Sequence, residues 1–233
     1  MNDSPAITLS HFSDILCIWA YIAQVRLDQL KQDFGSRVVL RYHYLPVFGA
    51  VNQKMTDNWS TRGGVEGYHQ HVLAIADDYD HVTVHPEVWK KDQPVSSTGI
   101  HLFLKALALV QDESLTTENP PGSGPSVLEQ FTWATRLAFF RDGVNVSQYQ
   151  NLVRLASEMG LPIEAIEAKI HSGEAYAALE KDQQISKSWQ VTGSPTLVFN
   201  EGRQIIYGNV GYRVIEANVR ELLHQPGNQA SWC

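Results

Sequence analysis

Cysteine is scarce in this sequence. Two cysteines, Cys17 and Cys233, occur in 233 residues and lie near opposite ends of the chain. This number is too small for a disulfide-framework protein or for a zinc module built on cysteine ligands. The two thiols can form one bridge or stay free, and composition alone leaves both states open.

Basic residues and long apolar runs are also few. The 18 Lys and Arg residues against 25 Asp and Glu give a formal net charge of −7, which argues against non-specific binding to nucleic acid or anionic membranes. The apolar run at residues 102–110 is interrupted by Lys105 and is far shorter than the roughly 20 residues of a membrane span. The first residues lack the pattern of a secretion signal, so we expect a cytoplasmic protein without membrane or nucleic-acid partners.

Histidine spacing predicts no metal site. His69 and His71 are two residues apart, and a helix would place them on different faces. His81 and His85 have no third ligand at a useful spacing. We therefore expect no metal.

The apolar content that is present predicts a folded α/β protein. Hydrophobic residues make up 43% of the chain and charged residues 18%, enough for a core and unlike a disordered chain. Residues 6–12 and 37–47 have strand patterns, and residues 17–34 between them have a helical pattern. Strand, helix and strand in this order predict a parallel pair with a right-handed crossover.

The middle and the end of the chain differ in pattern. Residues 57–190 are mostly helical, with a Pro, Gly and Ser loop at 116–126 and a capping box at 147–150. Residues 196–200 and 203–207 then predict a hairpin, and residues 213–224 a last helix. The first and last strands must share one sheet. We therefore expect a two-segment domain, 1–56 and 191–233, with 57–190 as an inserted helical domain.

Two positions carry the candidate chemistry. Cys17 follows the first strand at a predicted helix N-terminus, where free N–H groups favour a thiolate and lower the thiol pKa. The alternative is an inert buried cysteine, and position alone does not decide between them. Asp14 nearby reads best as a loop or capping residue. Gly193-Ser194-Pro195 forms a turn into a strand, where a cis Ser194–Pro195 bond would fit.

Together these segments resemble a known family. Phe12-Ser-Asp-Ile-Leu-Cys17-Ile-Trp-Ala-Tyr21 is similar to the F-x-D-x-x-C-x-W-C-Y segment of DsbA-like proteins of the thioredoxin-fold superfamily, which includes DsbA- and FrnE-type oxidoreductases. Residues 190–220 resemble the same family's cis-proline strand, hairpin and last helix. The resemblance implies a thioredoxin-like fold with an inserted all-helical domain. It also implies thiol–disulfide exchange at Cys17, with Trp19, Ala20, Ser194 and Pro195 as substrate-binding residues.

One departure from the family pattern bears on the mechanism. The redox motif C-x-x-C reads Cys17-Ile-Trp-Ala20 here, so the thiol that normally resolves the mixed disulfide is missing. Glutathione, oxidation to a sulfenic acid, or Cys233 as a resolving thiol could complete the cycle. We expect a monothiol oxidoreductase that needs no bound cofactor and takes a small or peptide thiol or disulfide, with glutathione as a candidate co-substrate. A homodimer is compatible with the resemblance.

Two other functions remain open. Kappa-class glutathione transferases and 2-hydroxychromene-2-carboxylate isomerases also lack the second cysteine, and this chain resembles them as relatives of the same superfamily. In that case Cys17 would stand where a serine usually activates glutathione. A non-catalytic binding module that has lost its redox pair is the third alternative.

Overall fold

The computed structural model describes residues 6–114 and 124–224. Most of the predicted loop at 116–126, the C-terminal tail and Cys233 lie outside these residues. Over the described part of the chain, no helix is long and apolar enough to cross a membrane.

Four strands form one mixed sheet in the order β2-β1-β3-β4. They are β1 (Ile7–Ser13), β2 (Val38–Tyr44), β3 (Thr196–Phe199) and β4 (Gln204–Tyr207). β1 and β2 are parallel and are joined by helix α1 (Ile18–Phe34), while β3 is antiparallel to both β1 and β4. The pairing of β1 with β3 confirms that the first and last strands of the chain share one sheet.

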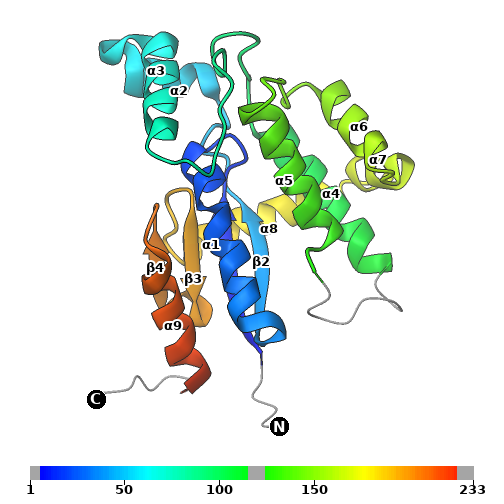
Figure 1. Cartoon of the computed structure of the whole chain (residues 1–233). Helices are drawn as coiled ribbons and strands as arrows, with labels where there is room; N and C mark the ends of the chain where they lie inside the picture. Colours follow the sequence, from blue (N-terminus) through cyan, green and yellow to red (C-terminus); the bar gives the residue numbers. More distant parts are fainter. Residues whose placement is uncertain (1–5, 115–123, 225–233) are drawn as a thin grey trace.

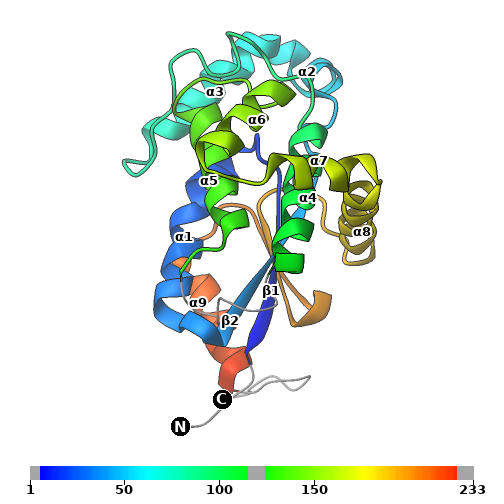
Figure 2. The same cartoon turned by 90° about the vertical axis from the view of Figure 1, so that its right-hand side faces the viewer.

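The two faces of the sheet carry different helices because side chains alternate along each strand. Leu9 packs with Leu30 of α1 and Val219 of α9 (Tyr212–His224) on one face. Phe12, three residues later, packs on the other face, against Trp189 at the end of α8 (Glu174–Ser188). Figure 2 shows the sheet between α1 and α9 on one side and α8 on the other.

The chain between β2 and α8 is helical, as predicted, and rises beside and above the sheet (Figure 1). The sequence pattern missed one element here, α2. It also placed a capping box at Ser147, which is wrong. The box lies at Ser126 and Glu129, at the start of α5, whereas Ser147 hydrogen-bonds to Asn145. These helices are α2 (Val51–Trp59), α3 (Gly64–Asp77), α4 (Thr98–Ser114), α5 (Val127–Phe140), α6 (Tyr149–Glu158) and α7 (Ile163–His171).

A buried polar cluster attaches α8 to the sheet. Asp182 of α8 accepts hydrogen bonds from the Tyr44 backbone N–H at 3.0 Å and from Lys105 of α4 at 3.1 Å, and its Oδ1 lies 2.8 Å from His43 Nδ1. α8 thus contacts β2 directly, although its residues fall within 57–190. The domain boundaries stay a prediction.

Candidate active site

Cys17 occupies the N-cap position of α1. β1 ends at Ser13, and a turn closed by the Cys17 N–H to Asp14 carbonyl hydrogen bond, 3.2 Å, leads into the helix. The Cys17 backbone is extended, and its carbonyl accepts from the N–H of Ala20 and of Tyr21, both at 3.1 Å. The side chain therefore sits at the helix entry, as the sequence predicts.

The antiparallel pairing of β1 with β3 brings Cys17 to the proline turn. Phe12 faces Thr196 in this register, so the segments that follow β1 and precede β3 meet at one edge. The Cys17 thiol donates to the Ser194 carbonyl oxygen at 3.2 Å, and the Asp14 N–H donates to the Ser194 hydroxyl at 2.9 Å. The Ser194–Pro195 peptide bond is cis. Cys17, Ser194 and Pro195 thus form one site from opposite ends of the chain.

The environment of the thiol opposes its ionisation. Cys17 is 6% exposed, and burial raises the pKa of its thiol above the ordinary value. Hydrogen bonds to Ser194 and to the backbone at Ala20 act in the opposite direction but do not offset burial, and the Asp14 carboxylate adds to the increase. The expectation of a lowered thiol pKa at the helix N-terminus is therefore wrong, because desolvation exceeds the effect of the helix end.

Asp14 is more than a capping residue. One carboxylate oxygen accepts from the Leu16 N–H at 2.8 Å, and the other from the Phe48 N–H at 2.8 Å and the Ser97 hydroxyl at 2.7 Å. Burial alone would raise the pKa of this carboxyl, but His101, 3.6 Å away, together with these hydrogen bonds holds it below its usual value. Asp14 is therefore a buried anion that joins β1, the segment after β2 and α4 beside the thiol.

The two other residues of the motif line the site differently. Ala20 is 1% exposed, so its methyl group fills the place of a resolving thiol within the core. Trp19 is partly exposed and packs edge-on against Tyr79. The Tyr79 hydroxyl accepts from the Asn209 side chain at 2.7 Å, which links the segment after α3 to the β4–α9 loop next to Trp19.

Sequence reasoning missed several polar side chains near the thiol. Electrostatic coupling of Tyr68, on α3, with both Cys17 and Asp14 contributes to its raised pKa, after burial. Arg136, on α5, couples to the same two residues. These residues are distant from Cys17 in sequence and fall within ordinary amphipathic helices, so no local motif could have indicated them.

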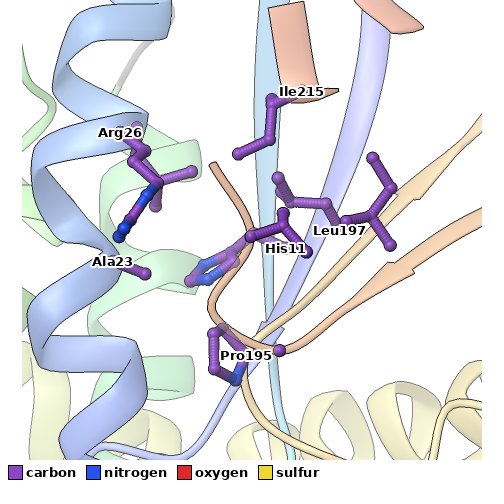
Figure 3. A pocket seen from close by; sticks show the side chains of 10 residues that line it. His11, Ala23, Arg26, Pro195, Leu197 and Ile215 are labelled. Atoms are coloured by element: carbon purple, nitrogen blue, oxygen red, sulfur yellow. The ribbon is translucent and has the colours of Figure 1, made fainter. Parts of the chain in front are cut away.

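A small cavity lies behind Pro195, between α1, β3, β4 and α9 (Figure 3). Its volume is about 20 Å³, far below the roughly 300 Å³ or more of a ligand pocket. His11 and Arg26 line it, and among the described residues neither His11 Nδ1 nor Arg26 Nη1 has a hydrogen-bond partner. Burial, with help from Arg136 and His43, lowers the pKa of His11 to about 3. The cavity behind Pro195 is therefore too small to hold a substrate.

The turn before Pro195 is closely packed at Gly193. A Cβ at this position would lie 2.2 Å from the Tyr207 ring, which is 65% exposed. We expect Gly193→Ala to displace the ring and to lower the free energy of unfolding by about 1 kcal/mol, as overpacking does. In a Tyr207→Ala background the same change should cost little, because the space is then open. Urea unfolding checks this, with Gly99→Ala as control, since a Cβ there meets nothing within 4 Å.

A destabilisation of Gly193→Ala that persists in the Tyr207→Ala background would contradict this packing. In that case the backbone conformation of the turn, and not contact with the ring, would be the cause of the destabilisation.

The family of the chain follows from a match over nearly its whole length. Residues 8–220 match the model of the DSBA-like thioredoxin domain. The chain belongs to this family. A search of curated proteins finds no match. The family relation confirms the resemblance carried by the Cys17 and Pro195 segments.

Solved structures with similar folds include oxidoreductases and an isomerase. A proposed protein disulfide isomerase from Nitrosomonas europaea is 16% identical, with a TM-score of 0.72 over 95% of this chain and 100% of that one. The cytosolic disulfide reductase DsbM from Pseudomonas aeruginosa is 20% identical, with a TM-score of 0.62 over 92% and 99%. A 2-hydroxychromene-2-carboxylate isomerase is 16% identical, with a TM-score of 0.60 over 94% and 97%. At these identities the likeness concerns the fold.

Within residues 6–114 and 124–224, no group of three or more His, Cys, Asp or Glu side chains is arranged to hold a metal ion.

Proposed function

We propose that the protein catalyses thiol–disulfide exchange at Cys17, with glutathione as the thiol that resolves the mixed disulfide. The observation that carries the proposal is the contact between the Cys17 thiol and the Ser194 carbonyl, 3.2 Å, next to the cis Ser194–Pro195 bond. The thiol and the proline turn together offer a reactive sulfur and a backbone edge for a substrate. The free-thiol state of Cys17 is compatible with a reducing, cytoplasmic location.

In the first step the Cys17 thiol loses its proton to solvent and its sulfur attacks one sulfur of a substrate disulfide. The substrate S–S bond breaks, a Cys17–substrate mixed disulfide forms, and the other half leaves as a thiolate that takes a proton from water. The helix N-terminus and the backbone N–H groups of Trp19 and Ala20 favour the attacking thiolate. Cys17 is the nucleophile in this step.

The second step requires a thiol from outside the motif, because Ala20 has none. A glutathione thiolate attacks the substrate sulfur of the mixed disulfide, releases Cys17 as a thiolate and forms a substrate–glutathione disulfide. A second glutathione then reduces this product, so two glutathione molecules become one glutathione disulfide while one substrate disulfide becomes two thiols. Electrons and protons balance without a bound cofactor.

Access to the sulfur favours small or extended substrates. Only 6% of Cys17 is exposed, and attack on a disulfide needs the sulfur atoms in line. We therefore expect a tripeptide such as glutathione to reach the sulfur more readily than a disulfide held on a rigid protein surface. Trp19, partly exposed beside the motif, would contact such a substrate.

The test is glutathione-dependent reduction of a small disulfide, such as hydroxyethyl disulfide, followed by coupled NADPH oxidation in a Cys233→Ser background. We expect turnover above the uncatalysed rate, and one glutathione on Cys17 by peptide mass after treatment with glutathione disulfide. Absence of both turnover and adduct would overturn the proposal. Turnover in the wild type that is lost in Cys233→Ser would instead identify the tail cysteine as the resolving thiol.

One observation favours a second candidate, a glutathione-dependent isomerase or transferase. Burial raises the pKa of Cys17, which suits a neutral thiol that hydrogen-bonds to bound glutathione better than it suits a nucleophile. The fold of a 2-hydroxychromene-2-carboxylate isomerase is similar. Conjugation of glutathione to a chromophoric electrophile, without disulfide reduction and without a Cys17 adduct, would favour this candidate.

A further inference from the structure

Arg136 is a buried guanidinium without an acidic partner. The residue is 1% exposed, and its two hydrogen bonds go to neutral groups, the Ser13 hydroxyl at 2.9 Å and the Gln24 side-chain carbonyl at 3.2 Å. Its Nε has no partner, and within the described residues no Asp or Glu oxygen lies within 4.0 Å of the side chain. A buried charge without an opposite charge in contact destabilises the folded protein. We therefore expect an anion to approach Arg136 in some state of the protein.

Helix packing places Arg136 against the face of α1 that carries Cys17. Tyr21 and Gln24 follow Cys17 by four and seven residues and share its side of the helix. Tyr21 stacks on Trp133 and Phe140 of α5, with ring centroids 5.2 and 4.9 Å apart, and Arg136 lies between these two on the same stripe. Its contact with Ser13, the last residue of β1, brings the guanidinium to the strand end that leads into Cys17.

We propose that Arg136 is a positioning residue that supplies the counter-charge for the Cys17 thiolate. The inference deepens the proposed function, since it assumes that this thiolate forms during exchange. In the resting state the guanidinium has only the more distant Asp14 carboxylate, and when Cys17 loses its proton it gains a second anion. Arg136 would thus offset part of the burial that opposes ionisation of the thiol.

Other ionisable groups surround this pair, and they do not remove the need for Arg136. Asp14 lies on the side of the thiol that faces α4 and is held by Leu16, Phe48, Ser97 and His101. The remaining groups are phenols or a neutral histidine, so Arg136 is the permanent cation of this set. The groups that interact electrostatically with Cys17 or Arg136 are Asp14, Tyr68, Tyr42, Tyr44 and His11.

The test measures the ionisation of Cys17 in Arg136→Met and Arg136→Lys, both in a Cys233→Ser background. Methionine removes the charge and keeps a flexible side chain of similar length, a change that buried sites often tolerate. The pH dependence of iodoacetamide alkylation at Cys17 gives the thiol pKa. We expect Arg136→Met to reduce the alkylation rate at pH 7 several-fold, because an opposite charge near the thiolate is lost, and Arg136→Lys to restore much of it.

Matched variants separate charge from packing. Ser13→Ala and Gln24→Leu each remove one partner of Arg136 and keep the charge, so alkylation at pH 7 should stay close to that of the parent. A folded Arg136→Met with an unchanged pH profile would overturn the inference. If Arg136→Met does not fold, a slower reaction in Ser13→Ala or Gln24→Leu, which both keep the charge, would also overturn it. Because alkylation measures ionisation and not exchange, a parent that alkylates normally yet has no turnover would count against the proposed function alone.

Discussion

Cys17→Ser should reduce disulfide reduction by about 1000-fold or more, the loss seen when a nucleophile is removed from a site that acts as a unit. The serine hydroxyl can donate to the Ser194 carbonyl as the thiol does at 3.2 Å, so the fold should persist. A hydroxyl does not ionise near neutral pH and cannot form a mixed disulfide. The measurement is the glutathione-coupled assay described above, with circular dichroism as the test of folding.

Two comparisons make this result specific. Cys233→Ser is the matched control and should retain the wild-type rate of disulfide reduction. Burial raises the folded-state pKa of Cys17 above the ordinary value of 9.0. The stability linked to its protonated thiol is therefore complete below the unfolded-state pKa and is lost as pH rises from there through the folded-state pKa. The thermal unfolding temperature should therefore fall above about pH 9 in the Cys233→Ser variant. It should fall less in the Cys17→Ser, Cys233→Ser double variant. A Cys17→Ser enzyme with a normal rate would exclude thiol catalysis at this position.

The strands and the outer helices could be predicted because each one carries a complete local pattern. β1, β2 and α9 alternate or repeat with the period of their own structure, and β3 follows a proline that cannot donate to a sheet. α2 was missed because it is a short helix of mostly polar residues, Val51–Trp59, whose apolar contacts come from other parts of the chain. Ser147 has the spacing of a capping box, but its N–H and its hydroxyl both donate to the Asn145 side chain, so it does not cap the helix.

The candidate site could be predicted only in part, for a similar reason. Cys17 and Pro195 stand within motifs, and pairing of β1 with β3 follows once they share a sheet. The ionisation state of the thiol depends on its burial in a core to which α3 and α5 contribute, and local periodicity cannot predict how these helices dock. Desolvation is a property of the assembled core, so the helix-end argument gave the wrong sign for the thiol pKa.

The second large effect concerns Asp14, which we expect to support the fold while opposing the thiolate. Asp14→Asn keeps the shape but loses the charge, and its amide oxygen can accept from Leu16 or from Phe48 but not from both, because the amide nitrogen replaces one carboxylate oxygen. Removing the charge of a buried, hydrogen-bonded carboxylate of this kind should lower the free energy of unfolding by about 3 kcal/mol. At the same time the Cys17 pKa should fall, because the Asp14 carboxylate is one of the groups that raise it. Urea unfolding and pH-dependent alkylation measure the two effects on one sample.

Acid unfolding gives the sign of the Asp14 contribution independently. Its folded-state pKa lies below the ordinary value of 3.8, so its stabilisation is complete above that value and is lost as pH falls through the folded-state pKa. Asp14→Asn should thus be less stable than the parent near pH 7, with a difference that narrows below about pH 4. Ser97→Ala is the control, since it removes one hydrogen bond to Asp14 and leaves the charge. If Ser97→Ala lowers the Cys17 pKa as much as Asp14→Asn does, hydrogen bonding rather than the carboxylate charge governs the thiol.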